Sequence, residues 1–207
     1  MPQSLTAPEV RALGALIEKD LSTPEYYPMT VSALVAACNQ KTNRDPVVSY
    51  VEMEVEAALE GLQRKRLAGS STSAHGRATR YRHALVEALG LDRPQLAILA
   101  ELLLRGPSTP GELRGRAARM TPISTLEEVD ETLRSLMERD EPLVTRLERR
   151  PGQKEARYAH LLAGEPVETD APTSNGVDAG LAERVEALER QVAELQAAFV
   201  EFRKQFE

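Results

Sequence analysis

The stretch "CNQKTNRDPVV", residues 38–48, concentrates groups that could do chemistry: one thiol, three amides and two basic side chains. Cations and amide donors in a turn suit a phosphate or the acidic groups of a partner. The residues that would make such contacts are Lys41, Asn43 and Arg44. The plainer interpretation is a well-specified turn, in which Asn39, Asn43 and Asp45 satisfy nearby backbone donors. The sequence leaves both interpretations open.

Catalysis at this stretch finds little support in the rest of the chain. Cys38 would need a neighbouring base to act as a nucleophile, and the histidines fall on wing or strand positions. These histidines are His75, His83 and His160. The sequence has no CxxC, HxxxH or HxH spacing, no GxGxxG and no phosphate-binding glycine loop. We therefore expect a non-enzymatic protein with no cofactor and no metal, in which Cys38 is an inert buried thiol.

Composition and charge set the broad class. The 207 residues include one cysteine, which is typical of a reducing cytoplasm. The N-terminus lacks the pattern of a signal peptide, and no apolar run approaches a membrane span, so we expect a cytoplasmic protein. The tail from Gly164 carries four basic and ten acidic residues, which accounts for the whole net charge of −6. The acidic balance therefore does not exclude basic patches on the first 163 residues.

An internal repeat organises these residues, because "RYRHAL" (80–85) and "RYAHLL" (157–162) each close a block with the same order of elements. In the first block, helical periodicity is predicted over 8–21, 30–38 and a third helix capped by Ser49. The apolar stripe predicted for that third helix is Val51, Val55, Ala58, Leu59 and Leu62. Strand-like segments around an "AHGRA" turn (74–78) follow.

The second block repeats this order with tighter connections. Its predicted helices are 93–106, one within 109–120, and 124–139, followed by a strand, turn and strand over 142–162. In the last helix the inward residues are expected to be Leu126, Val129, Leu133, Leu136 and Met137. Three helices and a hairpin make a winged helix, a variant of helix-turn-helix. The predicted fold is mainly α with small β-hairpins, in two tandem winged-helix domains over 1–90 and 91–163.

A flexible linker is predicted over 164–180, followed by a C-terminal coiled-coil helix over 181–207. The helix repeats apolar residues at alternating spacings of four and three. This dimerisation seam is Leu181, Val185, Leu188, Val192, Leu195, Phe199, Phe202 and Phe206. The pattern predicts a parallel homodimer. The alternative is an amphipathic helix that folds back on its own domains.

The segment "EKDLSTPEYYPMTVSALVAACNQKTNRDPVV" (18–48) resembles the YceH-type family of bacterial proteins. The block order extends the resemblance over roughly residues 5–162. It implies tandem winged helices in a bacterial cytoplasm, and it carries over no catalytic residues.

Winged helices usually bind DNA with the third helix in the major groove and the wing on the backbone. The candidate contacts in the first block are Lys41, Asn43, Arg44, Arg77, Arg80 and Arg82. Those in the second are Arg114, Arg116, Arg119, Arg149, Arg150 and Lys154. Such groups could neutralise several phosphates of double-stranded DNA. We therefore expect a DNA-binding, transcription-regulator-like protein.

The composition of the third helices is unfavourable for insertion into the major groove of DNA. Their expected outer faces carry several glutamates, which the phosphates would repel. The first offers Met53, Ala57, Glu60 and Arg64, flanked by Glu52, Glu54 and Glu56. The second offers Glu127, Glu131, Arg134, Ser135 and Glu138. The alternative function is a protein-interaction adaptor that uses winged helices without DNA, as in some chromosome-condensation proteins.

Overall fold

The computed structural model describes residues 4–72, 79–149 and 155–166. The chain divides into a unit over Met1–Pro166 and a second over Val167–Glu207, and all described residues belong to the first. The predicted linker and C-terminal helix therefore lie outside the described residues. Over the described ranges, no helix has the length and apolar content needed to cross a membrane.

The first half of the unit contains three α-helices and a hairpin. The elements are α1 (Ala7–Ser22), a short 3-10 turn η1 (Pro24–Tyr26), α2 (Val31–Cys38), α3 (Glu52–Arg64), β1 (Ala68–Thr72) and β2 (Thr79–His83). The start of α1 is fixed by a reciprocal cap, in which Thr6 and Glu9 each accept a hydrogen bond from the other's backbone N–H. Thr30 caps α2 on one side only, by accepting from Ala33 N.

The second half repeats the order after a short linking helix. Its elements are α4 (Leu85–Leu89), α5 (Arg93–Arg105), α6 (Pro110–Ala117), α7 (Leu126–Met137), β3 (Val144–Arg146) and β4 (Tyr158–His160). Reciprocal caps begin α5, α6 and α7, with Asp92, Thr109 and Thr125 as the N-cap residues. The described residues are mainly helical with two small antiparallel hairpins, which confirms that part of the predicted fold class.

The two hairpins show the repeat most directly. In the first, Ala68 pairs with His83, and in the second Val144 pairs with His160. Each hairpin also receives a bridge from the residue just before the second helix of its half, Met29 to Tyr81 and Ser108 to Tyr158. The recurring three-helix and hairpin order is consistent with a winged-helix-like architecture.

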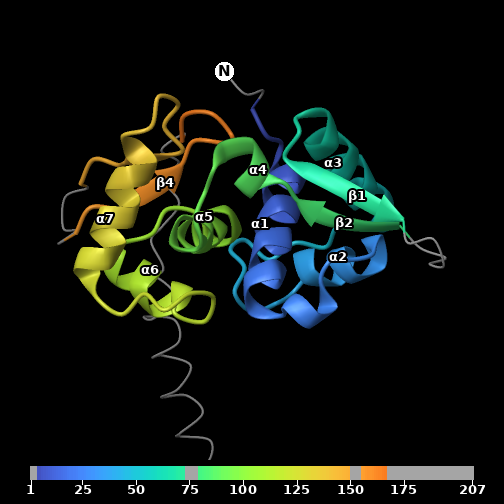
Figure 1. The fold of residues 1–207 in the computed structure, drawn as a ribbon, viewed down its shortest axis with the longest axis horizontal. Coiled ribbons are helices and arrows are strands. Elements are labelled where there is room, and N and C mark those ends of the chain that lie inside the picture. Colours follow the sequence, from blue (N-terminus) through green and yellow to red (C-terminus); the bar gives the residue numbers. More distant parts are fainter. Residues whose placement is uncertain (1–3, 73–78, 150–154, 167–207) are drawn as a thin grey trace, which may run out of the picture. The chain divides into compact units, whose positions relative to one another are not determined.

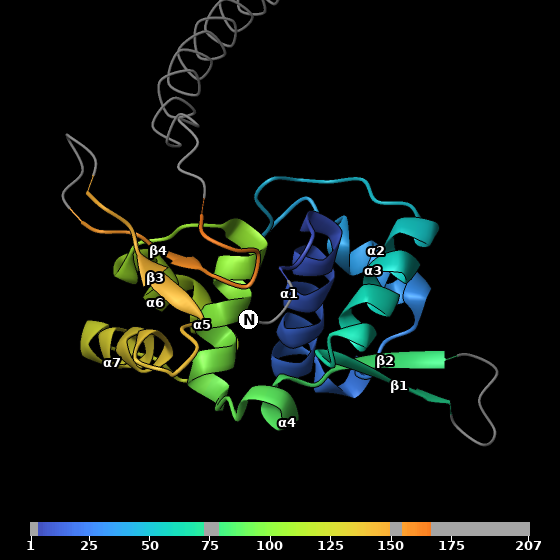
Figure 2. The same ribbon diagram turned by 90° about the horizontal axis from the view of Figure 1, so that it is seen from above.

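The core lies where α1 and α5 pack side by side, at the centre of both views (Figures 1 and 2). A single cluster of buried apolar residues runs through both halves. Gly14 makes the close approach of these helices possible, because a Cβ built on it would stand 3.0 Å from the Leu103 Cβ. The predicted boundary between domains at residues 90 and 91 lies between α4 and α5, and it stays a prediction.

Two details of the third helices differ from expectation. Helix α3 begins at Glu52 with Val51 as its N-cap, so Ser49 is not the cap. The Glu54 carboxylate accepts a hydrogen bond from the backbone N–H of Val51 at 2.9 Å, and this bond satisfies a donor that the helix itself cannot pair. The Val51 side chain is 56 % exposed, so it does not point inward as predicted. Leu126, the first residue of α7, is likewise exposed. The remaining inward residues are confirmed as buried, except Met137, which is half-buried.

Candidate functional site

The segment between α2 and α3, residues 39–51, is called here the interhelix segment. The Asn39 side chain closes it by donating to Tyr50 O at 2.7 Å and accepting from Tyr50 N at 2.8 Å. A second tie runs to the other half of the unit, where Asp45 N donates to Leu104 O at 2.9 Å. Figure 2 shows the segment passing from α3 over to the end of α5. The Asn39 side chain therefore satisfies a backbone donor as the turn interpretation predicts, whereas Asp45 contributes only its backbone N–H.

Arg44 points inward from this segment and is completely enclosed. Its guanidinium meets the Glu18 carboxylate of α1 at 2.5 and 3.1 Å, with the two side chains 0 % and 1 % exposed. The same guanidinium donates to Ala37 O at 2.9 Å. Every contact is internal, so Arg44 cannot reach a phosphate on a ligand. The expectation that Arg44 faces a ligand is corrected, because a long side chain can turn back under its own loop to pair with a buried acid.

The buried pair is part of a larger ionic cluster at the junction of α1 and α5. Arg119, which follows α6, lies 2.7 Å from both Glu18 and Glu101. Arg105 Nε lies 3.4 Å from Glu101 Oε2, a distance that allows an ion pair but not a hydrogen bond of good geometry. Burial alone would raise the pKa of Glu18, but the hydrogen bonds and charge of Arg44, aided by Arg119, bring that pKa below its ordinary value.

The cluster accounts for two more of the predicted contact residues. The Asn43 side-chain oxygen accepts a hydrogen bond from Arg105, and Asn43 adopts a left-handed backbone conformation with φ 59°. Arg119 is held by two carboxylates. Lys41 is exposed at the surface, whereas Asn43 is half-buried. Of the three residues proposed for the turn, only Lys41 therefore presents its side chain to solvent.

Some of the predicted contact cations near the hairpins are paired with other groups, and others are exposed. Arg80 on β2 is exposed but donates to Pro28 O at 2.8 Å, and Arg82 is paired with Glu87 at 2.5 Å. Arg116 is paired with Glu112 at 2.9 Å, whereas Arg114 and Arg149 are exposed. The candidates outside the described residues are Arg77, Arg150 and Lys154, together with the whole seam from Leu181 to Phe206.

Of the groups considered for catalysis, Cys38 and His83 are buried and His160 is half-buried, whereas His75 lies outside the described residues. Burial raises the pKa of the Cys38 thiol to about 12, so the thiolate is scarce at neutral pH. His83 lies 3.1 Å from Asp20, and burial lowers its pKa although that carboxylate opposes the change. Burial also lowers the pKa of His160, to about 4. Among the described residues, no hydrogen bond or ion pair joins any two of these three groups.

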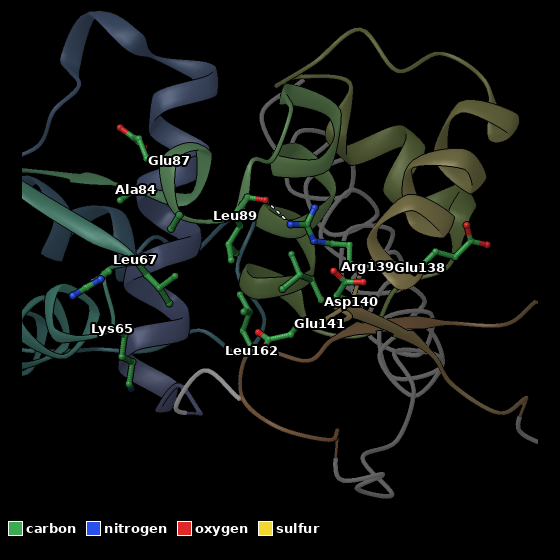
Figure 3. A pocket seen from close by; sticks show the side chains of 13 residues that line it. Lys65, Leu67, Ala84, Glu87, Leu89, Glu138, Arg139, Asp140, Glu141 and Leu162 are labelled. Carbon is green, nitrogen blue, oxygen red and sulfur yellow. Dashed lines mark hydrogen bonds between the residues drawn. The ribbon is translucent and has the colours of Figure 1, made fainter.

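A hollow of about 950 Å³ lies beside α4, between the end of α3 and the residues that follow α7 (Figure 3). Leu67, Leu89 and Leu162 contribute apolar surface to it. Its charged groups are largely committed elsewhere, since Lys65 binds Glu9 at 2.6 Å and Arg139 donates to Leu89 O at 2.5 Å. The hollow therefore joins the two halves without a set of converging free groups.

The outer surface of α3 is apolar at its start and acidic along its length. Three large apolar side chains are more than half exposed around that start: Val47 (54 %), Val51 (56 %) and Met53 (73 %). The neighbouring exposed acids are Glu52, Glu54, Glu56 and Glu60. We call these seven residues the α3 face. Sequence reasoning placed Met53 outward but missed Val47 and Val51, because valine beside a helix start ordinarily signals burial.

Comparisons with known proteins agree over nearly the whole chain. The family model described as "Protein of unknown function, DUF480" matches residues 5–153. A UPF0502 protein of Geotalea uraniireducens is 51 % identical and covers 100 % of both chains. Others from Geobacter sulfurreducens (53 % identical, 96 % of each chain) and Koribacter versatilis (49 %, with 92 % of this chain and 90 % of the relative) are also similar. The chain belongs to the DUF480 family of bacterial proteins, whose relatives here are called UPF0502 proteins.

Proposed function

We propose that this protein is a non-enzymatic binding protein of the bacterial cytoplasm, built from two tandem winged-helix domains. Its C-terminal residues 181–207 form a coiled coil that joins two copies. The repeated order of three helices and a hairpin, with the same bridge before the second helix in each half, supports the winged-helix assignment. The unbroken spacing of apolar residues from Leu181 to Phe206 supports the dimer.

We infer further that the ligand is a protein and that the α3 face binds it. One observation carries this inference: Val47, Val51 and Met53 are close in the chain and each more than half exposed, and exposed glutamates follow them along α3. Monomeric proteins rarely leave neighbouring large apolar side chains in water without a use for them. Acids around an apolar centre select a complementary partner, which here means an apolar segment flanked by lysines or arginines.

The burial of Arg44 and the pairing of Arg119, whose side chain is 33 % exposed, favour protein binding over insertion of α3 into a DNA groove. Both arginines were candidates for phosphate contact, and both are engaged with buried carboxylates. The exposed charged residues of α3 are four glutamates and one arginine, Arg64. Arg64 itself lies 3.9 Å from Glu60 and is therefore partly neutralised. A helix of this charge would meet repulsion in the major groove.

Affinity capture from bacterial lysate tests this proposal when it compares matched variants. Met53→Asp removes the most exposed apolar side chain of the α3 face, and Glu56→Lys with Glu60→Lys reverses its charge. Ser135→Asp places a new charge on the exposed side of α7 as a control. The expected result is a protein held by the parent and the control but lost from both α3 variants, and capture unaffected by all three variants contradicts the proposal.

Double-stranded DNA is a second candidate, favoured by the exposure of Lys41, Arg80, Arg114 and Arg149. Contact with the phosphate backbone by these residues would be independent of DNA sequence. A gel shift on random duplex at two salt concentrations measures it. If these cations bind phosphates, Lys41→Ala and Arg149→Ala each flatten the slope of log affinity against log salt by about one. Absence of a shift by the parent at low salt removes this candidate.

A further inference from the structure

A smaller cavity lies under the interhelix segment, with a volume of about 310 Å³. It is bounded by the first turn of α1, the interhelix segment, the end of α5 and the residues around β4. Val10, Val48, Leu102 and Leu103 are among its apolar walls. The volume stands at the lower end of the range for small-molecule sites, about 300 to 1,000 Å³.

From Pro46 onward the interhelix segment lines this cavity through alternate residues. Pro46, Val48 and Tyr50 face it, whereas Val47 and Val51 are exposed on the other side. Such alternation is typical of extended backbone. Asn39 and Asp45 hold the two ends of this stretch through the hydrogen bonds to Tyr50 and Leu104. The wall is therefore positioned by the fold and does not depend on a ligand for its conformation.

Arg11 brings a positive charge to the cavity wall without a matching negative partner. It is 4 % exposed, and it donates to two neutral carbonyl oxygens, Cys38 O at 3.1 Å and Pro46 O at 2.6 Å. Among the described residues no carboxylate lies within ion-pair distance of it. Asp45, which also lines the cavity, acts on Arg11 only through longer-range attraction. Burial, and then the nearby Arg44, lower the pKa of Arg11, so an anion beside it would relieve an uncompensated charge.

His160 supplies a second polar group without a partner. Its Nδ1 atom is buried and has no hydrogen-bond partner among the described residues, and the residue lines the same cavity. Buried polar atoms are ordinarily paired, and an unpaired one at a cavity wall is a place where a ligand atom can bind. A ligand oxygen can accept from Arg11, and another can accept from the His160 Nδ1 when that atom carries the ring proton.

We propose that this cavity binds a small organic carboxylate, with its carboxylate at Arg11 and its apolar body against Val10, Leu102 and Leu103. The apolar walls distinguish such a ligand from inorganic phosphate, which would leave them unfilled. The proposal concerns the inner side of the interhelix segment, and it is independent of protein binding at the α3 face on its outer side.

Titration of the full chain with three six-carbon probes, followed by amide NMR, tests the proposal. Hexanoate carries the charge, hexanol keeps the chain without the charge, and hexylammonium reverses the charge. Hexanoate is expected to shift the signals of Val10, Val48 and Gly106, and to bind at least about tenfold more tightly than hexanol, because its hydrogen bonds to Arg11 are charge-assisted. Hexylammonium is expected to bind most weakly.

A cavity-filling variant locates the binding. Val10→Phe occupies the cavity without removing a polar group, and Val86→Phe adds the same bulk at an exposed position of α4 as the control. Hexanoate binding should be lost in the first variant and kept in the second. Equal affinity of the parent for hexanoate and hexanol, shifts confined to other residues, or full hexanoate binding by folded Val10→Phe would each overturn the proposal. The comparison of probes on the parent stands even where that variant fails to fold.

Discussion

The Arg44 guanidinium and the Glu18 carboxylate meet in the interior, 2.5 Å apart at their closest atoms, with almost no solvent exposure on either side chain. This pair links the interhelix segment to α1, and through Arg119 and Glu101 it also links α1 to the second half of the unit. The polar stretch that first suggested a ligand site is therefore largely a structural connection. Its parts open to a ligand are Lys41 and Val47 on the outer side, and Pro46 and Val48 at the cavity.

Removal of Arg44 should destabilise the protein strongly. Arg44→Met leaves Glu18 with only Arg119 as a partner in a buried site, and breaking such a pair costs about 3 to 5 kcal/mol. Lys41→Met, three residues away on the surface, should change stability by no more than about 0.5 kcal/mol. Urea unfolding followed by circular dichroism measures both values. Similar losses in the two variants would show that the buried pair contributes little.

Helix packing at Gly14 gives a second prediction. A side chain there meets Leu103 and Leu104 at 3.0 Å, so Gly14→Val should separate α1 from α5 at a cost of about 1 to 3 kcal/mol. Gly115 on α6 has nothing within 4 Å of an added Cβ. Gly115→Ala should therefore stabilise the protein by about 0.5 to 1 kcal/mol through helix propensity. Thermal unfolding measures both effects. Unfolding temperatures that shift in the same direction for the two variants would contradict the packing argument.

Stability should fall as pH drops from 6.5 towards 4. Burial lowers the pKa of His160 to about 4, so in this window the unfolded state binds a proton that the folded state excludes. The contribution is up to about 1.4 kcal/mol per pH unit. His83, whose pKa burial also lowers, adds in the same direction. His160→Asn should reduce the slope of unfolding free energy against pH without abolishing it, and an unchanged slope would show that His160 titrates normally.

The positions of the core residues were predictable from periodicity, whereas the ionic cluster was not. Val55, Leu59 and Leu62 follow helical spacing and are buried as predicted. Arg44 pairs with an acid 26 positions earlier, and that acid also binds Arg119 from the other half. Such a pairing depends on how the two halves pack, which no local pattern encodes. The start of α3 was predicted two residues too early, because serine is a preferred N-cap residue and valine is not. In the structure Val51 is the N-cap, and the Glu54 side chain accepts from its backbone N–H.

The proposed dimer is tested by charges in the seam. Leu188→Asp with Leu195→Asp places carboxylates at two positions that a coiled coil buries. Light scattering should give a dimer for the parent and a monomer for the double variant, and circular dichroism should show that the helices of residues 4–166 remain folded. A parent that is monomeric at tens of micromolar would instead favour a helix that packs on its own chain.

The proposal that the α3 face binds a protein is tested most directly by photocrosslinking in living bacteria. Benzoyl-phenylalanine is introduced at Met53, and at Ser135 on the exposed side of α7 as the matched control. The account predicts a protein adduct from position 53 only, joined to a segment rich in lysine or arginine, and lost when Glu56→Lys and Glu60→Lys are added. Nucleic acid as the crosslinked species, equal adducts from both positions, or no adduct at position 53 would contradict it.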